Sequence, residues 1–172
     1  MSDTYEDELE QSRAETRAAF ETRGFMYAYL YEELADELGA ERAQELMKRA
    51  IYRRGLEIGR KYRSAAHAGD LAEVGAIFCD GSPCGGDLFN PGIEQEGDDH
   101  IVLSMTSCPL VDAWKEAGLD PEEIDVMCSI SAAVDEGTFE AAGLDLEFLD
   151  RIGRPGSEKC LLLLRTRGGE EL

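Results

Sequence analysis

The sequence predicts a single α+β domain, with long N-terminal helices packed on a small, mainly antiparallel C-terminal sheet and two intervening helices. The first 80 residues carry apolar side chains at helical spacing, and a Gly- and Pro-rich stretch follows from Cys79 to Gly97. Short apolar segments then alternate with helix signals. Of the 172 residues, 43 % are apolar, which is enough to bury one core. We expect this one domain to comprise an N-terminal helical arm (1–23), a helical half (24–80), a mixed α/β half (81–166) and a frayed tail (167–172).

Two long helices are expected in the helical half. Apolar side chains three and four residues apart predict the first: Leu30, Tyr31, Leu34 and Leu38. Gly39 ends it, and the second runs from about Glu41 to about Ala66. Gly55 and Gly59 lie on or beside the apolar stripe of that second helix. Because glycine weakens a helix, we expect another element to approach closely there.

The rest of the chain alternates between helices and strands. A short helix is expected from Leu71 to about Phe78, another from Pro109 to Gly118, and a third from Asp120 to about Ser131 or Val134. The Gly- and Pro-rich stretch holds at most one strand, so the predicted sheet has three or four strands. Three segments have the composition of strands: Ile101–Met105, Leu144–Phe148 and Cys160–Leu164.

Net charge excludes several function classes. Seventeen Lys and Arg residues against thirty-seven Asp and Glu residues give a charge of −20, which disfavours binding to a nucleic-acid backbone or an anionic membrane. No apolar segment has the length of a membrane span, and the acidic N-terminus is unlike a secretory signal. We therefore expect a cytoplasmic protein with reduced cysteines. Thirteen Arg against four Lys fit either a salt-adapted, halophilic source or an ordinary acidic protein.

Cys108 is the most informative candidate site residue. It follows a predicted strand and precedes Pro109, which favours the first position of a helix. As N-cap, Cys108 would face unpaired backbone N–H groups and the positive end of the helix dipole, which lower a thiol pKa. The residue is then a nucleophile or a metal ligand, and the alternative is a small buried thiol.

Two further cysteines and an aspartate extend this candidate site. Asp135 follows Cys128 by seven residues, which places both on one face if the helix persists, as nucleophile and base or as two ligands. Cys160 opens the last strand and would complete a three-thiol site for zinc or an iron–sulfur cluster. All three also fit ordinary core or helix-end positions. Cys79 and Cys84 form a weaker metal pair, for which a flexible loop is the alternative.

A basic cluster stands out against the acidic background. Seven basic residues lie between Lys48 and Arg63 with one acid, Glu57. Most fit a solvated surface, and one or two of them, such as Arg54, would hold a substrate carboxylate. Trp114 fits a core anchor and is also a candidate substrate contact, together with Cys160. His100, beside Asp99, fits a general base or an exposed turn residue.

An ordered set of motifs resembles the L-2-amino-thiazoline-4-carboxylic acid hydrolase family. It covers about residues 25 to 165. The set is Arg53-Arg54-Gly55-Leu56-Glu57-Ile58-Gly59-Arg60-Lys61-Tyr62; Cys108-Pro109-Leu110 followed by Trp114 and Gly118; Cys128 with Asp135 and Gly137; and Gly156 and Ser157 with Cys160.

The resemblance implies hydrolysis of a C–N or C–S bond in a small cyclic sulfur-containing amino-acid derivative. A Cys108 thiolate would attack the ring carbon or hold a metal that activates water, Asp135 would move the proton, and Arg54 would hold the carboxylate. The order of elements also resembles vinyl-reductase-type small-molecule-binding domains. These imply a non-catalytic module that binds a metal, a cluster or an apolar ligand through Cys108, Cys128 and Cys160. A third alternative is a homodimer whose interface surrounds Gly55 and Gly59.

Overall fold

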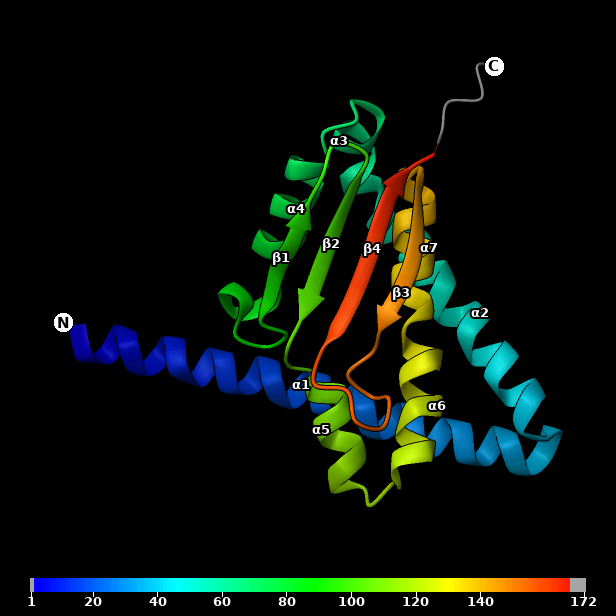
Figure 1. The fold of residues 1–172 in the computed structure, drawn as a ribbon. Helices are drawn as coiled ribbons and strands as arrows, with labels where there is room; N and C mark the ends of the chain where they lie inside the picture. Colours follow the sequence, from blue (N-terminus) through cyan, green and yellow to red (C-terminus); the bar gives the residue numbers. More distant parts are fainter. Residues whose placement is uncertain (1, 168–172) are drawn as a thin grey trace.

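The computed structural model describes residues 2–167 as seven α-helices, two short 3₁₀ turns and four strands (Figure 1). The predicted tail, beyond Arg167, lies outside the described residues. The helical half contains α1 (Ser2–Leu38), α2 (Ala40–Ile58), η1 (Gly59–Tyr62), α3 (Arg63–His67) and α4 (Leu71–Asp80). The mixed half contains η2 (Pro83–Gly86), β1 (Pro91–Glu96), β2 (His100–Met105), α5 (Pro109–Glu116), α6 (Pro121–Ser131), α7 (Ala133–Ala142), β3 (Leu144–Asp150) and β4 (Cys160–Thr166).

The four strands form one antiparallel sheet in the order β1-β2-β4-β3. The predicted fold class is therefore confirmed. The central pair sets the register, with Ile101 opposite Leu164 and Met105 opposite Cys160. Because side chains alternate across a strand, one face of the central pair carries Ile101, Leu103, Leu162 and Leu164, all fully buried.

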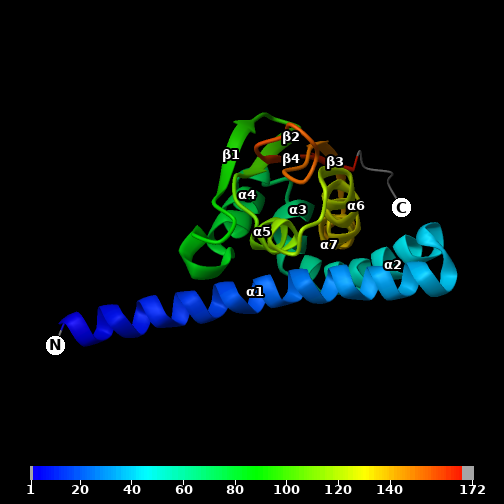
Figure 2. The same cartoon turned by 90° about the horizontal axis from the view of Figure 1, so that it is seen from below.

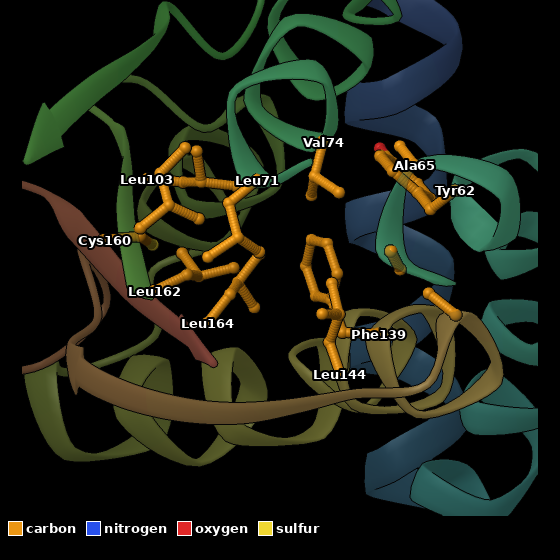
Figure 3. Packing of buried hydrophobic residues seen from close by; sticks show 13 residues of the cluster. Tyr62, Ala65, Leu71, Val74, Leu103, Phe139, Leu144, Cys160, Leu162 and Leu164 are labelled. Atoms are coloured by element: carbon orange, nitrogen blue, oxygen red, sulfur yellow. The ribbon is translucent and has the colours of Figure 1, made fainter. Parts of the chain in front are cut away.

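Helices cover this apolar face in two layers. α4 and α7 pack on the sheet, and Phe139 of α7 meets Val74 of α4 and Tyr62 in the core between them (Figure 3). The long helices α1 and α2 lie outside this layer, where α1 packs on α5 and α2 packs on α7 (Figure 2). Of the two long helices, α2 reaches the sheet through α7 rather than by direct packing.

Glycines allow the close packing of α2 on α7. A Cβ atom on Gly55 would collide with the backbone of Val134 and Thr138, and one on Gly137 would collide with the backbone of Tyr52. The expected close approach to this stripe is confirmed. The homodimer interface centred on Gly55 and Gly59 is wrong in its location, because α7 of the same chain covers both glycines.

The 3₁₀ turn η1 and the helix α7 depart from the predictions, whereas the end of α6 at Ser131 and the one strand of the Gly- and Pro-rich stretch agree with them. The second helix ends at Ile58 instead of continuing to Ala66, because the chain tightens into the 3₁₀ turn η1 at Gly59. The helix from Asp120 ends at Ser131, and a further helix, α7, follows it after Ala132. The Gly- and Pro-rich stretch contributes β1 as an edge strand. The predicted start at Asp120 is confirmed by a capping box with Glu123.

Candidate functional site

Three cysteines from three different elements lie at one end of the sheet. Cys108 is the N-cap of α5, three residues after β2 ends, and Cys160 is the first residue of β4, paired with Met105 at that end of β2. Cys128 lies on α6, and α6 lies below this end of the sheet in Figure 1. All three are free thiols.

The connection between β3 and β4 holds two of these thiols in place. The Ile152 backbone N–H donates a hydrogen bond to Cys160 Sγ at 3.4 Å. Gly153 packs so closely on Cys128 that any side chain there would collide with its Cβ and Sγ atoms. Ile152 also contacts the core around Phe139 and the core around Trp114. We name the three cysteines with this covering loop the thiol cluster.

Burial dominates the electrostatics of the thiol cluster. It raises the pKa of Cys108 to about 11, although the backbone N–H groups of Val111 and Leu110 act in the opposite direction. The predicted N-cap position is confirmed, but the predicted lowering of its pKa is wrong, because desolvation outweighs the helix N-terminus. Burial also raises the pKa of Cys160, to about 12, with smaller contributions from Cys128, Cys108 and Asp135. The charges of Cys128, Cys108 and Asp135 therefore all act on the Cys160 thiol.

Asp135 is the titratable carboxyl group of this region. It lies in the first turn of α7, where burial and then the charge of Glu136 raise its pKa to about 7. Its charge also contributes to the raised pKa values of Tyr62 and Cys160, so its carboxyl group acts electrostatically on both side chains. A carboxyl group with this pKa can both accept and donate a proton at neutral pH.

Arg151 is the site residue that the sequence did not indicate. Its guanidinium Nη2 lies 2.7 Å from Asp125 Oδ1, and its side chain is only 18 % exposed. The positive charge of the guanidinium also lowers the pKa of the nearby Cys128 thiol, although burial has the larger, raising effect. Nε of Arg151 is buried without a hydrogen-bond partner. The residue lies in a Gly- and Pro-containing loop, where no spacing pattern relates it to Cys128.

The other predicted site residues lie elsewhere. Arg54 is exposed on α2, and its Nη1 is 2.6 Å from Glu57 Oε2, so it does not join the thiol cluster. Trp114 is fully buried and its indole N–H donates to the Gly24 carbonyl at 2.9 Å, which anchors α5 on α1. Cys79 lies in the last turn of α4 and Cys84 lies in η2. His100, at the opposite end of β2, contacts Asp99 and Gln95.

Within residues 2–167, no three His, Cys, Asp or Glu side chains are grouped as a metal ion would require. The zinc or iron–sulfur interpretation of Cys108, Cys128 and Cys160 therefore has no geometric support in this part of the chain. Among the same residues, no helix combines the length and apolarity needed to span a bilayer.

Comparison with solved structures supports the architecture of the chain. Trafficking protein particle complex subunit 3 from Naegleria fowleri, covalently bound to palmitic acid, has a TM-score of 0.58 at 10 % identity, over 88 % of this chain and 96 % of that chain. The phenol-responsive sensory domain of the transcription activator PoxR, solved with phenol, has a TM-score of 0.44 at 16 % identity, over 86 % and 74 %. The first similarity supports the architecture alone, and the second is too low to support an argument.

Comparisons of sequence give the family. No curated protein matches the chain significantly. The family model for L-2-amino-thiazoline-4-carboxylic acid hydrolase matches residues 17–161, which include Cys108, Cys128, Asp135, Arg151 and Cys160. The chain therefore belongs to the L-2-amino-thiazoline-4-carboxylic acid hydrolase family.

Proposed function

We propose that this protein is a hydrolase that opens a small cyclic amidine ring carrying a carboxylate, at the thiol cluster. The observation that carries the proposal is the buried Arg151 beside the Cys128 thiol. A buried guanidinium N–H without a partner is costly, and an incoming anion would relieve that cost. The thiazoline carboxylate named by the family combines such an anion with an electrophilic ring carbon.

Arg151 replaces Arg54 as the carboxylate-binding residue in this proposal. Its fork is already oriented by Asp125, so little side-chain entropy is lost when the substrate binds. Arg54 faces solvent and is paired with Glu57, where water and salt would weaken its hold on a carboxylate.

Cys108 is assigned as the nucleophile because it is the one residue of the three cysteines that is partly exposed, at the N-terminus of α5. With its pKa raised to about 11, the thiol is neutral at pH 7 and must lose its proton as it attacks. Sγ bonds to the ring carbon between sulfur and nitrogen, one ring bond breaks, and the departing ring atom takes up the proton. Water then replaces Sγ on that carbon and returns a proton to the thiol, so the net reaction consumes one water.

Asp135 is assigned to proton transfer. Its pKa of about 7 suits a group that must take up a proton in one half of the cycle and release it in the other. Cys160 and Cys128 are the buried thiols of the same cluster, and the charges of Cys108 and Asp135 both act on Cys160. Their buried thiols keep the surroundings apolar, which strengthens the attraction between Arg151 and a carboxylate.

Incubation with 2-amino-thiazoline-4-carboxylate tests the proposal. Cleavage of the ring C–S bond releases a free thiol, whereas cleavage of the ring C–N bond releases a free amine, so thiol and amine reagents identify the broken bond. We expect turnover by the wild type, a loss of at least about a hundredfold in Cys108→Ser, and wild-type rates in the matched Cys84→Ser control. Saturable binding by calorimetry without any ring opening would reject the enzyme and assign the cluster to a ligand-binding module.

A further inference from the structure

We infer that Asp150 is a positioning residue of the proposed site, because its carboxylate holds the covering loop closed over two thiols and sets Arg151 beside Cys128. The covering loop is residues 151–159, which connect β3 to β4 and lie beside α6 (Figure 1). For the role of Arg151 the inference rests on the proposed function, whereas the closure of the loop is measured without any substrate.

The carboxylate of Asp150 joins the two ends of the covering loop. Its Oδ1 accepts a hydrogen bond from the Arg151 backbone N–H at 2.8 Å, and its Oδ2 accepts one from the Ser157 hydroxyl at 2.8 Å. Arg154 Nη1 also lies 3.6 Å from Oδ1. Because hydrogen bonds to an ionised carboxylate are the stronger kind, this one side chain clasps the loop at its start, middle and end.

The backbone of the covering loop forms two consecutive turns inside this clasp. The Arg154 N–H donates to the Arg151 carbonyl at 2.9 Å, and the Ser157 N–H donates to the Arg154 carbonyl at 3.0 Å. Gly156, with a φ of +83°, provides the left-handed residue that the second turn requires. Each turn closes only a few residues, so the contact between Asp150 and Ser157 is what brings the two turns together.

The inner side of the covering loop packs on the thiols. Gly153 is buried, and a Cβ atom there would collide with the side chain of Cys128. The neighbouring Ile152 N–H donates to Cys160 Sγ at 3.4 Å. Residues 154–156, in contrast, are exposed. The loop therefore separates both buried thiols from solvent, and displacement of Ile152 and Gly153 uncovers them.

The same loop carries the proposed carboxylate-binding group. Asp150 fixes the backbone from which the Arg151 side chain extends, and Asp125 of α6 holds the guanidinium at 2.7 Å. At the far end of the loop, Lys159 Nζ lies 3.0 Å from Glu94 Oε1 on β1. The two ends of the loop are thus anchored to the body of the protein, so opening is a movement of the middle of the loop, which Asp150 restrains.

Thiol labelling without substrate measures the closure of the loop. We expect iodoacetamide to modify the Cys128 and Cys160 peptides at least about tenfold faster in Asp150→Ala than in the wild type, because hydrogen bonds to a charged group are lost. Asp145→Ala, on the same strand and paired with Arg167, is the matched control and should label at the wild-type rate.

A second pair of variants tests the clasp at its other end. Ser157→Ala removes the hydroxyl that donates to Asp150, and we expect faster labelling of both peptides. Ser157→Thr keeps a hydroxyl at the same position and should restore the wild-type rate. Circular dichroism checks that each variant is folded. Folded Asp150→Ala and Ser157→Ala proteins that both label at the wild-type rate would overturn the closure.

Kinetics with 2-amino-thiazoline-4-carboxylate separate positioning from a purely structural role. We expect Asp150→Ala to raise KM about tenfold with a smaller change in kcat, because Arg151 loses its fixed backbone and with it the oriented contact to a carboxylate. Asp145→Ala should leave both constants unchanged. A wild-type KM in a rapidly labelled Asp150→Ala protein would overturn the positioning of Arg151. A wild type without turnover rejects the proposed function alone, since the labelling rates still decide whether Asp150 closes the loop.

Discussion

At the scale of single residues, burial decides the chemistry of the candidate site. Cys108 occupies the helix N-terminus expected to create a reactive thiolate, yet its pKa is raised to about 11. The Pro at the following position makes the N-cap predictable, because that preference is local. The depth at which the thiol lies depends on α6 and on the β3–β4 loop, which are distant in sequence. A motif can therefore locate this thiol but cannot give the sign of its pKa shift.

The alkylation of Cys108 should follow its raised pKa. In the folded protein, iodoacetamide labelling of the peptide that contains Cys108 should increase with pH toward a midpoint near 11. In urea the same peptide should label with an ordinary thiol pKa of about 8.5, which serves as the internal control. Labelling of the folded protein with a midpoint at or below 8.5 would show that Cys108 is not desolvated.

Asp135 should make the folded state less stable as pH rises. Its pKa of about 7 in the folded protein lies above its ordinary value of 3.8, so the folded state binds the proton more tightly. The contribution is fully present below about pH 4 and is lost as pH rises through 7. Asp135→Asn should therefore match the wild type in Tm at pH 4 and exceed it at pH 8. Glu116→Gln, an exposed substitution on α5, is the control, and equal Tm values for Asp135→Asn and wild type at pH 8 would contradict the shift.

At the scale of elements, local signals predicted the helix ends and strands better than the packing between them. The capping box at Asp120 and the strand at Cys160–Leu164 follow from neighbouring residues alone. The helix α7 was not predicted, because Gly137 and Thr138 interrupt its apolar pattern. Both residues serve contact with α2: Gly137 admits the Tyr52 backbone, and the Thr138 hydroxyl donates to the Gly55 carbonyl at 3.3 Å. The sequence signal for α7 is weak because these two positions are occupied by residues that fit the contact with α2 rather than by residues that favour a helix.

The α2–α7 contact gives a substitution test with a clear sign. In an ordinary helix interior, Gly→Ala is stabilising by about 0.5–1 kcal/mol. Gly55→Ala should instead destabilise the protein by about 1–3 kcal/mol, because the new methyl group meets the α7 backbone. Ala50→Gly, at an exposed position of the same helix, measures the propensity effect alone. Urea unfolding provides both values, and a Gly55→Ala protein more stable than wild type would contradict the observed packing.

At the scale of the whole molecule, charge is distributed unevenly. The basic run from Lys48 to Arg63 stands out against the net charge of −20, and the structure spreads it over α2, η1 and α3 and divides it by environment. Arg54 pairs with Glu57, Arg63 donates to the Ala141 carbonyl at 2.8 Å, and Arg49, Arg53 and Arg60 are exposed. The buried cation of the thiol cluster, Arg151, lies outside the run altogether. The density of basic residues in the sequence therefore indicated an exposed basic surface. The proposed site depends instead on one partly buried arginine, Arg151, which the β3–β4 loop places beside Cys128.

The central claim is that Arg151 and the thiol cluster form one site for a carboxylate-bearing ring. The steady-state kinetics of Arg151→Lys with 2-amino-thiazoline-4-carboxylate tests it most directly, because lysine keeps the charge but loses the fork. We predict a KM raised about ten- to a hundredfold, as expected for losing a hydrogen bond to a charged group. Arg154→Lys, in the same loop but exposed and paired with Asp150, should retain the wild-type KM. A folded Arg151→Lys protein with the wild-type KM and kcat would contradict the claim.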